Sequence, residues 1–382
     1  MRFDFASAGR ILFGQGRLAE AGRFAASLGR RALVVTGSNS DRAEPLLDAL
    51  ADFQVETEFF SVSREPTVEL VRSAAAKARE AGCDMVAGFG GGSAIDTAKA
   101  VSALLPNEGD LLDYLEVIGE GRALEKPAFP CIAVPTTAGT GAEVTRNAVI
   151  ASPPHRVKVS LRHGSMLPDL AVVDPGLTIS VPPEVTAASG LDALTQLVEP
   201  FVSRMANPLT DALCREGLLR ASRSLRAAWL DGSDIEARED MCVASLFGGL
   251  ALANAKLGAV HGIAGPFGGM FPGAPHGAVC ARLLPAVMTA NIKALANRGE
   301  SLGRFDEVAR LLTGSAEAAA ADGVKWVEDL CAGMDIAPLG QWGFGETGFE
   351  DLAERALRAS SMKGNPVELG AAELEAIFRA SL

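Results

Sequence analysis

The sequence contains few aromatic residues, few histidines and fewer basic than acidic residues. Aromatic residues occupy 5% of the 382 positions, with a single Tyr, and only four residues are His. The 35 Lys and Arg are outnumbered by 47 Asp and Glu, so the formal net charge is -12. Because such a surface repels a phosphate backbone, we expect no nucleic-acid partner.

The sequence also lacks long apolar runs and closely paired cysteines. No uncharged apolar stretch reaches the ~20 residues of a membrane span, and the N-terminus carries no signal-peptide pattern. We therefore expect a cytoplasmic protein with no membrane partner. The cysteines form no CxxC pair and several lie in apolar runs, which favours reduced core thiols over disulfides or a zinc knuckle. They are Cys83, Cys131, Cys214, Cys242, Cys280 and Cys331.

The first half of the chain alternates between short apolar segments and Ala-rich segments. This alternation predicts a mostly parallel sheet with helices on both faces. One helix is expected over 68–81, with Gly82 as its C-terminal stop. The expected strands are 32–36, 57–60, 85–89, 131–134 and 170–174.

After residue 181 the apolar residues change to helical spacing. Pro182 and Pro183 fit the first turn of a helix, so they mark a boundary. Domains usually hold roughly 100–200 residues, which favours two of them here. We expect an α/β domain over 1–181 and an all-α domain over 182–382. The expected helices are 185–202, 209–230, 235–255 and 283–296.

A glycine cluster follows the expected strand 85–89, in the stretch GFGGGSAIDTAKA. Glycines let backbone N–H groups approach a phosphate, and the N-terminus of the following helix adds its positive end. Gly91, Gly92 and Ser93 therefore predict a pyrophosphate site. The stretch departs from the usual GxGxxG fingerprint, and a plain tight turn is the alternative.

A second polar loop, PTTAGTGAEVT, follows the expected strand 131–134. It places Thr136, Thr137 and Thr140 at the carboxyl end of a strand, where open α/β sheets bind ligands. A Ser/Thr turn with only local hydrogen bonds is the alternative.

Two of the four histidines flank one Gly/Pro-rich connection. His261 and His276 can converge there as metal ligands. Asp192 and Gln196 are four residues apart, so on a helix they share one face and offer two oxygens; a solvated polar face is the alternative. The other two histidines, at 155 and 163, are expected to be surface groups.

Taken in order, these motifs resemble the iron-containing (group III) alcohol dehydrogenase family. The resemblance includes the stretch 5–16 and the closing segment 362–366. It implies a dinucleotide-binding α/β domain followed by an all-α domain, an architecture like that of dehydroquinate synthase, in a homodimer or larger homo-oligomer. It also implies hydride transfer between NAD or NADP and a small alcohol, aldehyde or ketone.

The resemblance also assigns roles to individual residues. It implies cofactor contacts from Gly91, Gly92, Ser93 and Asp96 at the pyrophosphate, from Thr136, Thr137 and Thr140 at the nicotinamide, and from Lys158. It implies a divalent metal, Fe²⁺ or Zn²⁺, on Asp192, Gln196, His261 and His276, with the metal acting as a Lewis acid.

Two positions depart from the family pattern at the metal site. Gln196 replaces a histidine and is a weaker neutral oxygen ligand, which puts metal identity in question. Gly265 replaces a histidine linked to proton relay, so the proton donor is not identified.

The loop after the expected strand 32–36 bears on the choice of dinucleotide. An acid there binds the ribose 2′-OH and disfavours a 2′-phosphate, but this chain has Gly37, followed by the neutral donors Ser38 and Asn39. Arg42 offers a charge-assisted contact if it turns inward. We therefore expect NADP(H) to be accepted at least as well as NAD(H). The alternative is a polar turn with Asp41 as a helix N-cap.

Three other functions remain open at this point. A maleylacetate-type reductase works without a metal and needs cations for a dicarboxylate, for which Arg146 and Lys256 are candidates, but that branch tends to carry Asn at position 192. A sugar-phosphate lyase of the dehydroquinate-synthase type needs a basic phosphate cluster, which we do not find. A nucleotide-binding protein without catalysis is conceivable because of Gln196 and Gly265.

Overall fold

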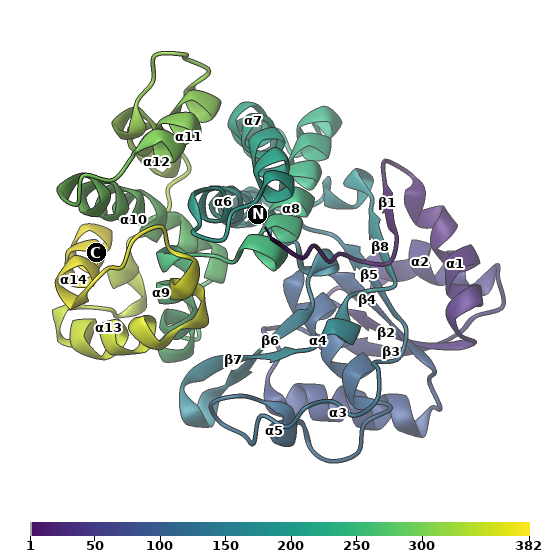
Figure 1. The fold of residues 1–382 in the computed structure, drawn as a ribbon. Helices are drawn as coiled ribbons and strands as arrows, with labels where there is room; N and C mark the ends of the chain where they lie inside the picture. Colours follow the sequence, from purple (N-terminus) through teal and green to yellow (C-terminus); the bar gives the residue numbers. More distant parts are fainter. Residues whose placement is uncertain (1) are drawn as a thin grey trace. The chain divides into compact units, whose positions relative to one another are not determined.

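The chain divides into two units of different construction. The computed structural model describes residues 2–382 (Figure 1). The first unit comprises Ala6–Thr137 and Gly141–Ser180. The second comprises Val181–Leu382, Ala138–Thr140 and the N-terminal stretch up to Phe5. The domain bounds 1–181 and 182–382 stay a prediction from the sequence.

The first unit contains a parallel six-stranded sheet in the order β1-β8-β5-β4-β2-β3. The five strands expected from the sequence are all present. The additional edge strand β1 has only three residues, too few to show alternation. The strands are β1 (Ile11–Phe13), β2 (Arg31–Thr36), β3 (Glu56–Ser61), β4 (Met85–Gly90), β5 (Cys131–Pro135) and β8 (Leu170–Val173).

Helices cover both faces of this sheet, as the sequence predicts. Along β2, Leu33 and Val35 pack into one apolar cluster with α3 and α4, while Val34 packs into another with α1 and α2. Gly82 follows α3 with a φ of 68°, in the left-handed conformation of a helix stop. The helices are α1 (Ala21–Leu28), α2 (Glu44–Ala51), α3 (Val68–Glu80), α4 (Gly92–Leu104) and the short α5 (Leu111–Tyr114).

The sequence analysis missed an antiparallel hairpin in the first unit. Strands β6 (Asn147–Ser152) and β7 (Val157–Arg162) pair in a separate two-stranded sheet. Only Ala148 and Ile150 of β6 are buried apolar residues, and such a weak pattern does not distinguish a strand from a loop.

The second unit is all-helical, which confirms the prediction. Its first helix, α6, begins at Pro183, with Pro182 as N-cap. Nearly all of α6 after Ser189 is buried, so α6 is the central helix of the unit. The helices are α6 (Pro183–Val202), α7 (Pro208–Leu230), α8 (Ile235–Ala255), α9 (Ala259–Met270), α10 (His276–Asn297), α11 (Gly303–Thr313), α12 (Ala320–Gly333), α13 (Phe349–Arg358) and α14 (Ala371–Ser381).

By length and composition, α10 is the one single helix of the described chain that could cross a membrane. Half of its apolar window is buried inside the protein, where it packs against α6, α9, α12 and α14. The consecutive helices α8 and α9 pass the same test only as a pair, and they meet at 97°. These are features of core helices.

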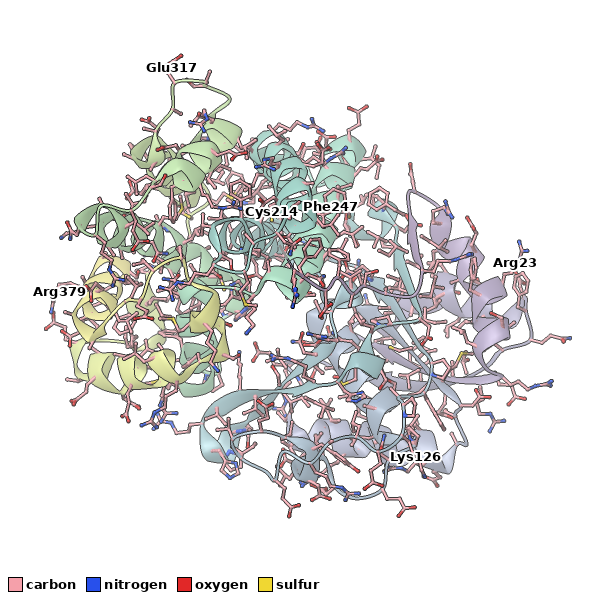
Figure 2. The ribbon with its side chains drawn as sticks, viewed as in Figure 1. Arg23, Lys126, Cys214, Phe247, Glu317 and Arg379 are labelled. Atoms are coloured by element: carbon pink, nitrogen blue, oxygen red, sulfur yellow. The ribbon has the colours of Figure 1, made fainter. Side chains whose placement is uncertain are left out.

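All six cysteines are buried and free, as predicted. Figure 2 shows Cys214 among the helices of the second unit, whereas the side chains of Glu317 and Arg379 point outward from that unit. Cys214 is therefore part of the core packing of that unit.

Candidate functional site

The central helix α6 presents two polar side chains on one buried face. The Asp192 side chain is only 3% exposed, and Gln196 Nε2 donates a hydrogen bond to Asp192 Oδ2 at 2.9 Å. The predicted shared face is therefore confirmed, and it is buried rather than solvated.

Helix α9 adds His261 in its first turn. His261 Nδ1 lies 2.7 Å from Glu199 Oε2, and Glu199 Oε1 accepts the backbone N–H of Val260 at 2.7 Å. Because the carboxylate accepts a hydrogen bond from Nδ1–H, a neutral His261 has its lone pair on the other ring nitrogen. This Nε2 faces Asp192 Oδ1 at 3.4 Å. A carboxylate behind a histidine is the usual support for a metal-binding imidazole.

Helix α10 adds His276 at its first residue and Cys280 one turn later. The rings of His261 and His276 lie 5.5 Å apart between centroids, and Cys280 Sγ is 3.6 Å from His276 Nε2. One donor atom from each of Asp192, His261, His276 and Cys280 lies within 4.8 Å of the others. We refer to these four residues as the donor cluster. The sequence analysis missed Cys280, although its i,i+4 spacing from His276 was a usable signal.

Three buried polar atoms at this place make no hydrogen bond in the described protein: Asp192 Oδ1, Gln196 Oε1 and His261 Nε2. A buried polar atom without a partner costs about 1–3 kcal/mol, so their concentration on neighbouring side chains indicates a ligand site. Carboxylate, imidazole and thiolate are all ligands of divalent transition metals. The residues present therefore fit a divalent cation.

The ionisation of the cluster also favours a bound cation. Burial raises the pKa of Asp192, but the nearby His261 side chain and the charges of both histidines hold it below its ordinary value. Burial lowers the pKa of His261, but Cys280, Asp192 and Glu199 carry it well above its ordinary value. Burial raises the pKa of the Cys280 thiol to about 12. The surroundings of His261 therefore stabilise positive charge at this place.

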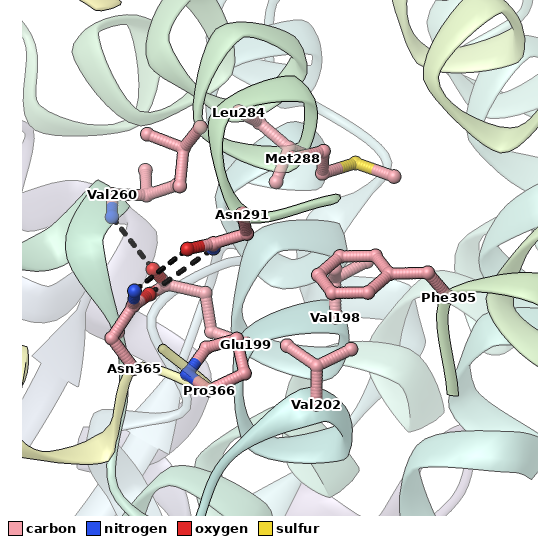
Figure 3. A pocket seen from close by; sticks show the side chains of 12 residues that line it. Val198, Glu199, Val202, Val260, Leu284, Met288, Asn291, Phe305, Asn365 and Pro366 are labelled. Atoms are coloured by element: carbon pink, nitrogen blue, oxygen red, sulfur yellow. Dashed lines mark hydrogen bonds between the residues drawn. The ribbon is translucent and has the colours of Figure 1, made fainter. Parts of the chain in front are cut away.

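A small cavity is bordered by Glu199, the residue that contacts His261 (Figure 3). Its volume is about 10 Å³, which is room for one water molecule and excludes an organic substrate. The paired amides of Asn291 and Asn365 border it, and Asn365 Oδ1 also accepts the backbone N–H of Ala259 at 3.0 Å. This network holds the N-terminus of α9 and, with Glu199, fixes the orientation of His261.

In the first unit, the sheet order places two glycine turns next to each other. Strand β2 pairs with β3 on one side and with β4 on the other, so the direction of strand addition reverses between β2 and β4. Open α/β sheets bind ligands at such a reversal. A Cβ on Gly90, whose φ is 155°, would lie 2.8 Å from Ala94 Cβ and 3.3 Å from the backbone N of Gly37. The loops after β2 and β4 therefore meet backbone to backbone.

The predicted pyrophosphate residues begin helix α4. Gly91 is the N-cap, and Gly92 and Ser93 are the first two helical residues. This thirteen-residue helix therefore starts where the strand order reverses, which fits a dinucleotide. Asp96, by contrast, has protein partners: it pairs with the fully buried Lys99 at 2.9 Å and accepts the N–H of Val149 at 2.9 Å.

The predicted threonines do not all lie in one unit. The N–H of Thr136 donates to Gly90 O at 2.9 Å, and a Cβ on Gly91 would lie 3.4 Å from Thr137 Oγ1. Thr140 belongs to the helical unit. Lys158 lies on β7 with its side chain 6% exposed, and its Nζ pairs with Glu65 at 2.6 Å. Lys158 therefore has an acidic partner within the protein.

The loop after β2 differs in two respects from the expectation. The N-cap of its 3₁₀ helix is Asn39, whose side chain accepts the N–H of Asp41, so the alternative with Asp41 as N-cap is wrong. The guanidinium of Arg42 donates a hydrogen bond to Leu177 O at 2.8 Å. Arg42 therefore contacts the turn that follows β8, and this contact does not support the expected contact with a phosphate. A Cβ added to Gly37 would have no heavy atom from the surrounding protein within 4 Å, and Ser38 is exposed.

The remaining candidates are accounted for as follows. His155 is exposed, as expected. His163 is half-buried and caps a 3₁₀ helix by accepting the N–H of Ser165. Arg146 and Lys256 are both exposed and belong to different units. A Cβ added to Gly265 would have no heavy atom from the surrounding protein within 4 Å, so this position has room for a side chain.

Comparison with known proteins agrees with this arrangement. Residues 8–175 match the family model "Iron-containing alcohol dehydrogenase", and residues 186–382 match "Fe-containing alcohol dehydrogenase family, C-terminal". The chain is 39% identical over 329 residues to long-chain-alcohol dehydrogenase 1 of Geobacillus thermodenitrificans strain NG80-2, covering 85% of this chain and 81% of that protein.

Two solved structures extend the comparison. A 1,3-propanediol oxidoreductase matches all of both chains with a TM-score of 0.93 and 33% identity. Sulfoacetaldehyde reductase from Bifidobacterium kashiwanohense, in complex with NAD⁺, matches with a TM-score of 0.86 and 30% identity, covering 100% of this chain and 99% of that one. The matched family consists of alcohol dehydrogenases, which are oxidoreductases, and the donor cluster is a candidate metal site. The chain belongs to the iron-containing alcohol dehydrogenase family.

Proposed function

We propose that the chain transfers a hydride reversibly between NAD(P)(H) and a small alcohol or aldehyde, with a divalent cation held by the helical unit. The observation that supports this most is the set of three buried, unpartnered atoms on Asp192, Gln196 and His261. Unpartnered buried atoms destabilise the fold until a ligand pairs with them, which supports a bound cation at this place.

In this proposal Asp192, His261 and His276 hold the cation, with Gln196 Oε1 or Cys280 Sγ as the fourth protein ligand. A divalent cation held there would polarise a carbonyl oxygen in reduction and would lower the pKa of an alcohol in oxidation. Asp192 supplies the negative charge, and Glu199 keeps the proton of His261 on Nδ1. The retained acid at Asp192 also disfavours a metal-free maleylacetate-type reaction.

The proposed cofactor site uses the α/β unit. The backbone N–H groups of Gly91, Gly92 and Ser93 would bind the pyrophosphate at the start of α4, and Thr136 and Thr137 would border the nicotinamide half. Thr140 and Lys158 remain proposed contacts, and Asp96 would act by holding α4 through Lys99 and Val149. Gly37, Ser38 and Asn39 would leave room for a 2′-phosphate. We further propose a homodimer or larger homo-oligomer located in the cytoplasm.

The test is an aldehyde panel assayed with NADH and NADPH, before and after treatment with a chelator. We expect turnover with at least one short aldehyde, loss of activity on metal removal and recovery on addition of Zn²⁺ or Fe²⁺. Stoichiometric cofactor binding without turnover across the panel would contradict the proposal. Full activity after verified removal of all metal would contradict its cation.

A further inference from the structure

Gln196 already has a partner that fixes the direction of its amide. Its Nε2 donates to Asp192 Oδ2, so the carboxylate is held with Oδ1 facing His261 Nε2. Oε1 is the only ligand atom that Gln196 has left, and a neutral amide oxygen binds Zn²⁺ or Fe²⁺ more weakly than an imidazole or a thiolate. Gln196 is therefore placed to orient Asp192.

The fourth member of the donor cluster comes from α10. Cys280 is fully buried and lies one helical turn after His276, so both side chains leave the helix on the same face. Its sulfur is 3.6 Å from His276 Nε2. The same cluster contains two atoms without a hydrogen-bond partner, Asp192 Oδ1 and His261 Nε2, on side chains that are more than nine-tenths buried. No other cysteine of the described chain belongs to such a group.

The distances between donor atoms agree with a four-coordinate centre. Zinc bonds of about 2.0–2.1 Å to nitrogen or oxygen and about 2.3 Å to sulfur give tetrahedral edges of roughly 3.3 Å between two light atoms and roughly 3.6 Å between nitrogen and sulfur. The observed separations are 3.4 Å between Asp192 Oδ1 and His261 Nε2 and 3.6 Å between His276 Nε2 and Cys280 Sγ. Two of the six donor separations therefore match those expected between metal ligands, and the other pairs lie within 4.8 Å.

We infer that Cys280 binds the cation as a thiolate, that it completes a site with Asp192, His261 and His276, and that Gln196 positions Asp192 without ligating. This inference rests on the proposed function, since it concerns the same cation. Binding exchanges the S–H bond for a metal–sulfur bond and releases the thiol proton to solvent, with no change of oxidation state. Because a thiolate is a soft ligand, the site takes Zn²⁺ in preference to Fe²⁺.

The test loads the full-length, metal-depleted protein with Co²⁺ as a spectroscopic probe. We expect a thiolate-to-Co²⁺ charge-transfer band in the near ultraviolet for the wild type and for Gln196→Ala, and none for Cys280→Ser. Cys214→Ser is the matched control, because Cys214 is an equally buried helical thiol of the same unit. It should keep the band.

Metal competition provides the second measurement. Cys280→Ser should lower Zn²⁺ affinity by about 100-fold or more. Mutation of a residue that only hydrogen-bonds to a metal ligand typically lowers metal affinity by about 10–100-fold. Cys280→Ser should also reduce the preference for Zn²⁺ over Fe²⁺ by at least about tenfold. X-ray absorption of the wild-type zinc form should show one sulfur at about 2.3 Å, a result that does not depend on any variant folding.

The outcomes separate this inference from the function it rests on. Bound Co²⁺ without the charge-transfer band, or a band that survives in Cys280→Ser, overturns the cysteine ligand and leaves a metal-dependent oxidoreductase in place. Failure of the wild type to bind Co²⁺, Zn²⁺ or Fe²⁺ overturns both.

Discussion

The two units present their candidate sites in different ways. In the α/β unit the site consists of backbone: glycine turns after β2 and β4 and the first N–H groups of α4. In the helical unit it consists of side chains that converge from α6, α9 and α10. A backbone site follows from a local run of sequence, whereas a side-chain site depends on how separate helices pack.

The pKa values of two buried carboxyl groups, one in each unit, are shifted in opposite directions. Asp192 lies among histidines that hold its pKa below the ordinary value. Glu143, in the loop after β5, has its pKa raised by burial to about 7, and its own backbone N–H and the charge of Lys99 offset only part of this. Positive neighbours therefore keep Asp192 ionised, whereas Glu143 binds a proton near neutral pH.

The largest effect is expected for Asp192→Asn, which removes the negative charge of the donor cluster. A cation contributes several kcal/mol to the transition state, so its loss should lower kcat/KM by about 10³-fold or more. The bound metal, measured by elemental analysis, should fall with it. Asp329→Asn on the exposed face of α12 is the control and should change neither. A variant that keeps its metal and more than a tenth of its activity would contradict the role of Asp192.

The second prediction uses the pH dependence of Glu143. The ordinary pKa of Glu143 is 4.5, and its pKa in the folded protein is about 7. Between pH 4.5 and pH 7 the folded state therefore retains a proton that the unfolded state has lost. The wild type is therefore destabilised as pH rises from 4.5 to 7, by on the order of 3 kcal/mol above pH 7. Glu143→Gln lacks this loss.

Thermal unfolding at several pH values checks this prediction. The melting temperature of Glu143→Gln, relative to the wild type, should rise from pH 5 to pH 8. Exposed Glu184→Gln should show no such trend. Parallel pH profiles for the wild type and Glu143→Gln would mean that Glu143 is ionised at neutral pH in the folded protein.

The third prediction concerns the residue behind His261. In Glu199→Gln an amide NH₂ can face His261 Nδ1, which favours the tautomer with its proton on Nε2 and removes the lone pair from the donor cluster. Zn²⁺ affinity should fall by roughly 10–100-fold while the KM for the dinucleotide stays unchanged. Glu184→Gln, on the exposed first turn of the same helix, serves as the control. Unchanged affinity would show that Glu199 is only structural.

The smallest effect is expected at the cofactor loop. Gly37→Asp has room for its side chain and should shift the ratio of kcat/KM values toward NADH by about tenfold, through repulsion of a 2′-phosphate. Gly37→Asn has the same shape without the charge and should shift it much less. A wild-type enzyme that prefers NADH more than tenfold would contradict the interpretation of this loop.

Much of the fold could be predicted because its signals are local. Apolar spacing predicts five strands of the sheet and the all-helical second half. The proline positions predict the start of α6 at Pro183. The hairpin β6–β7 and the edge strand β1 could not be predicted, since half-buried or three-residue strands carry too little pattern. The sequence could not show that the N-cap is Asn39 and not Asp41, because both residue types cap helices equally well and the local turn decides between them.

The sequence by itself determined the residue types of both candidate sites. The glycine turn before α4, the i,i+4 pair of Asp192 and Gln196 and the clustering of His261 with His276 are all visible in the linear chain. These features suffice because helix periodicity and glycine conformation act over a few residues.

Only the tertiary structure decided which of these residues have partners. It brings Cys280 to His261, pairs Lys158 with Glu65, joins Asp96 to the backbone N–H of Val149, and places Glu199 behind His261. Each of these contacts joins segments that are distant in sequence or set by the packing of whole helices. The physical reason is that a buried charge or donor is satisfied by whatever the fold places beside it, and the spacing of residues along the chain does not encode that neighbour.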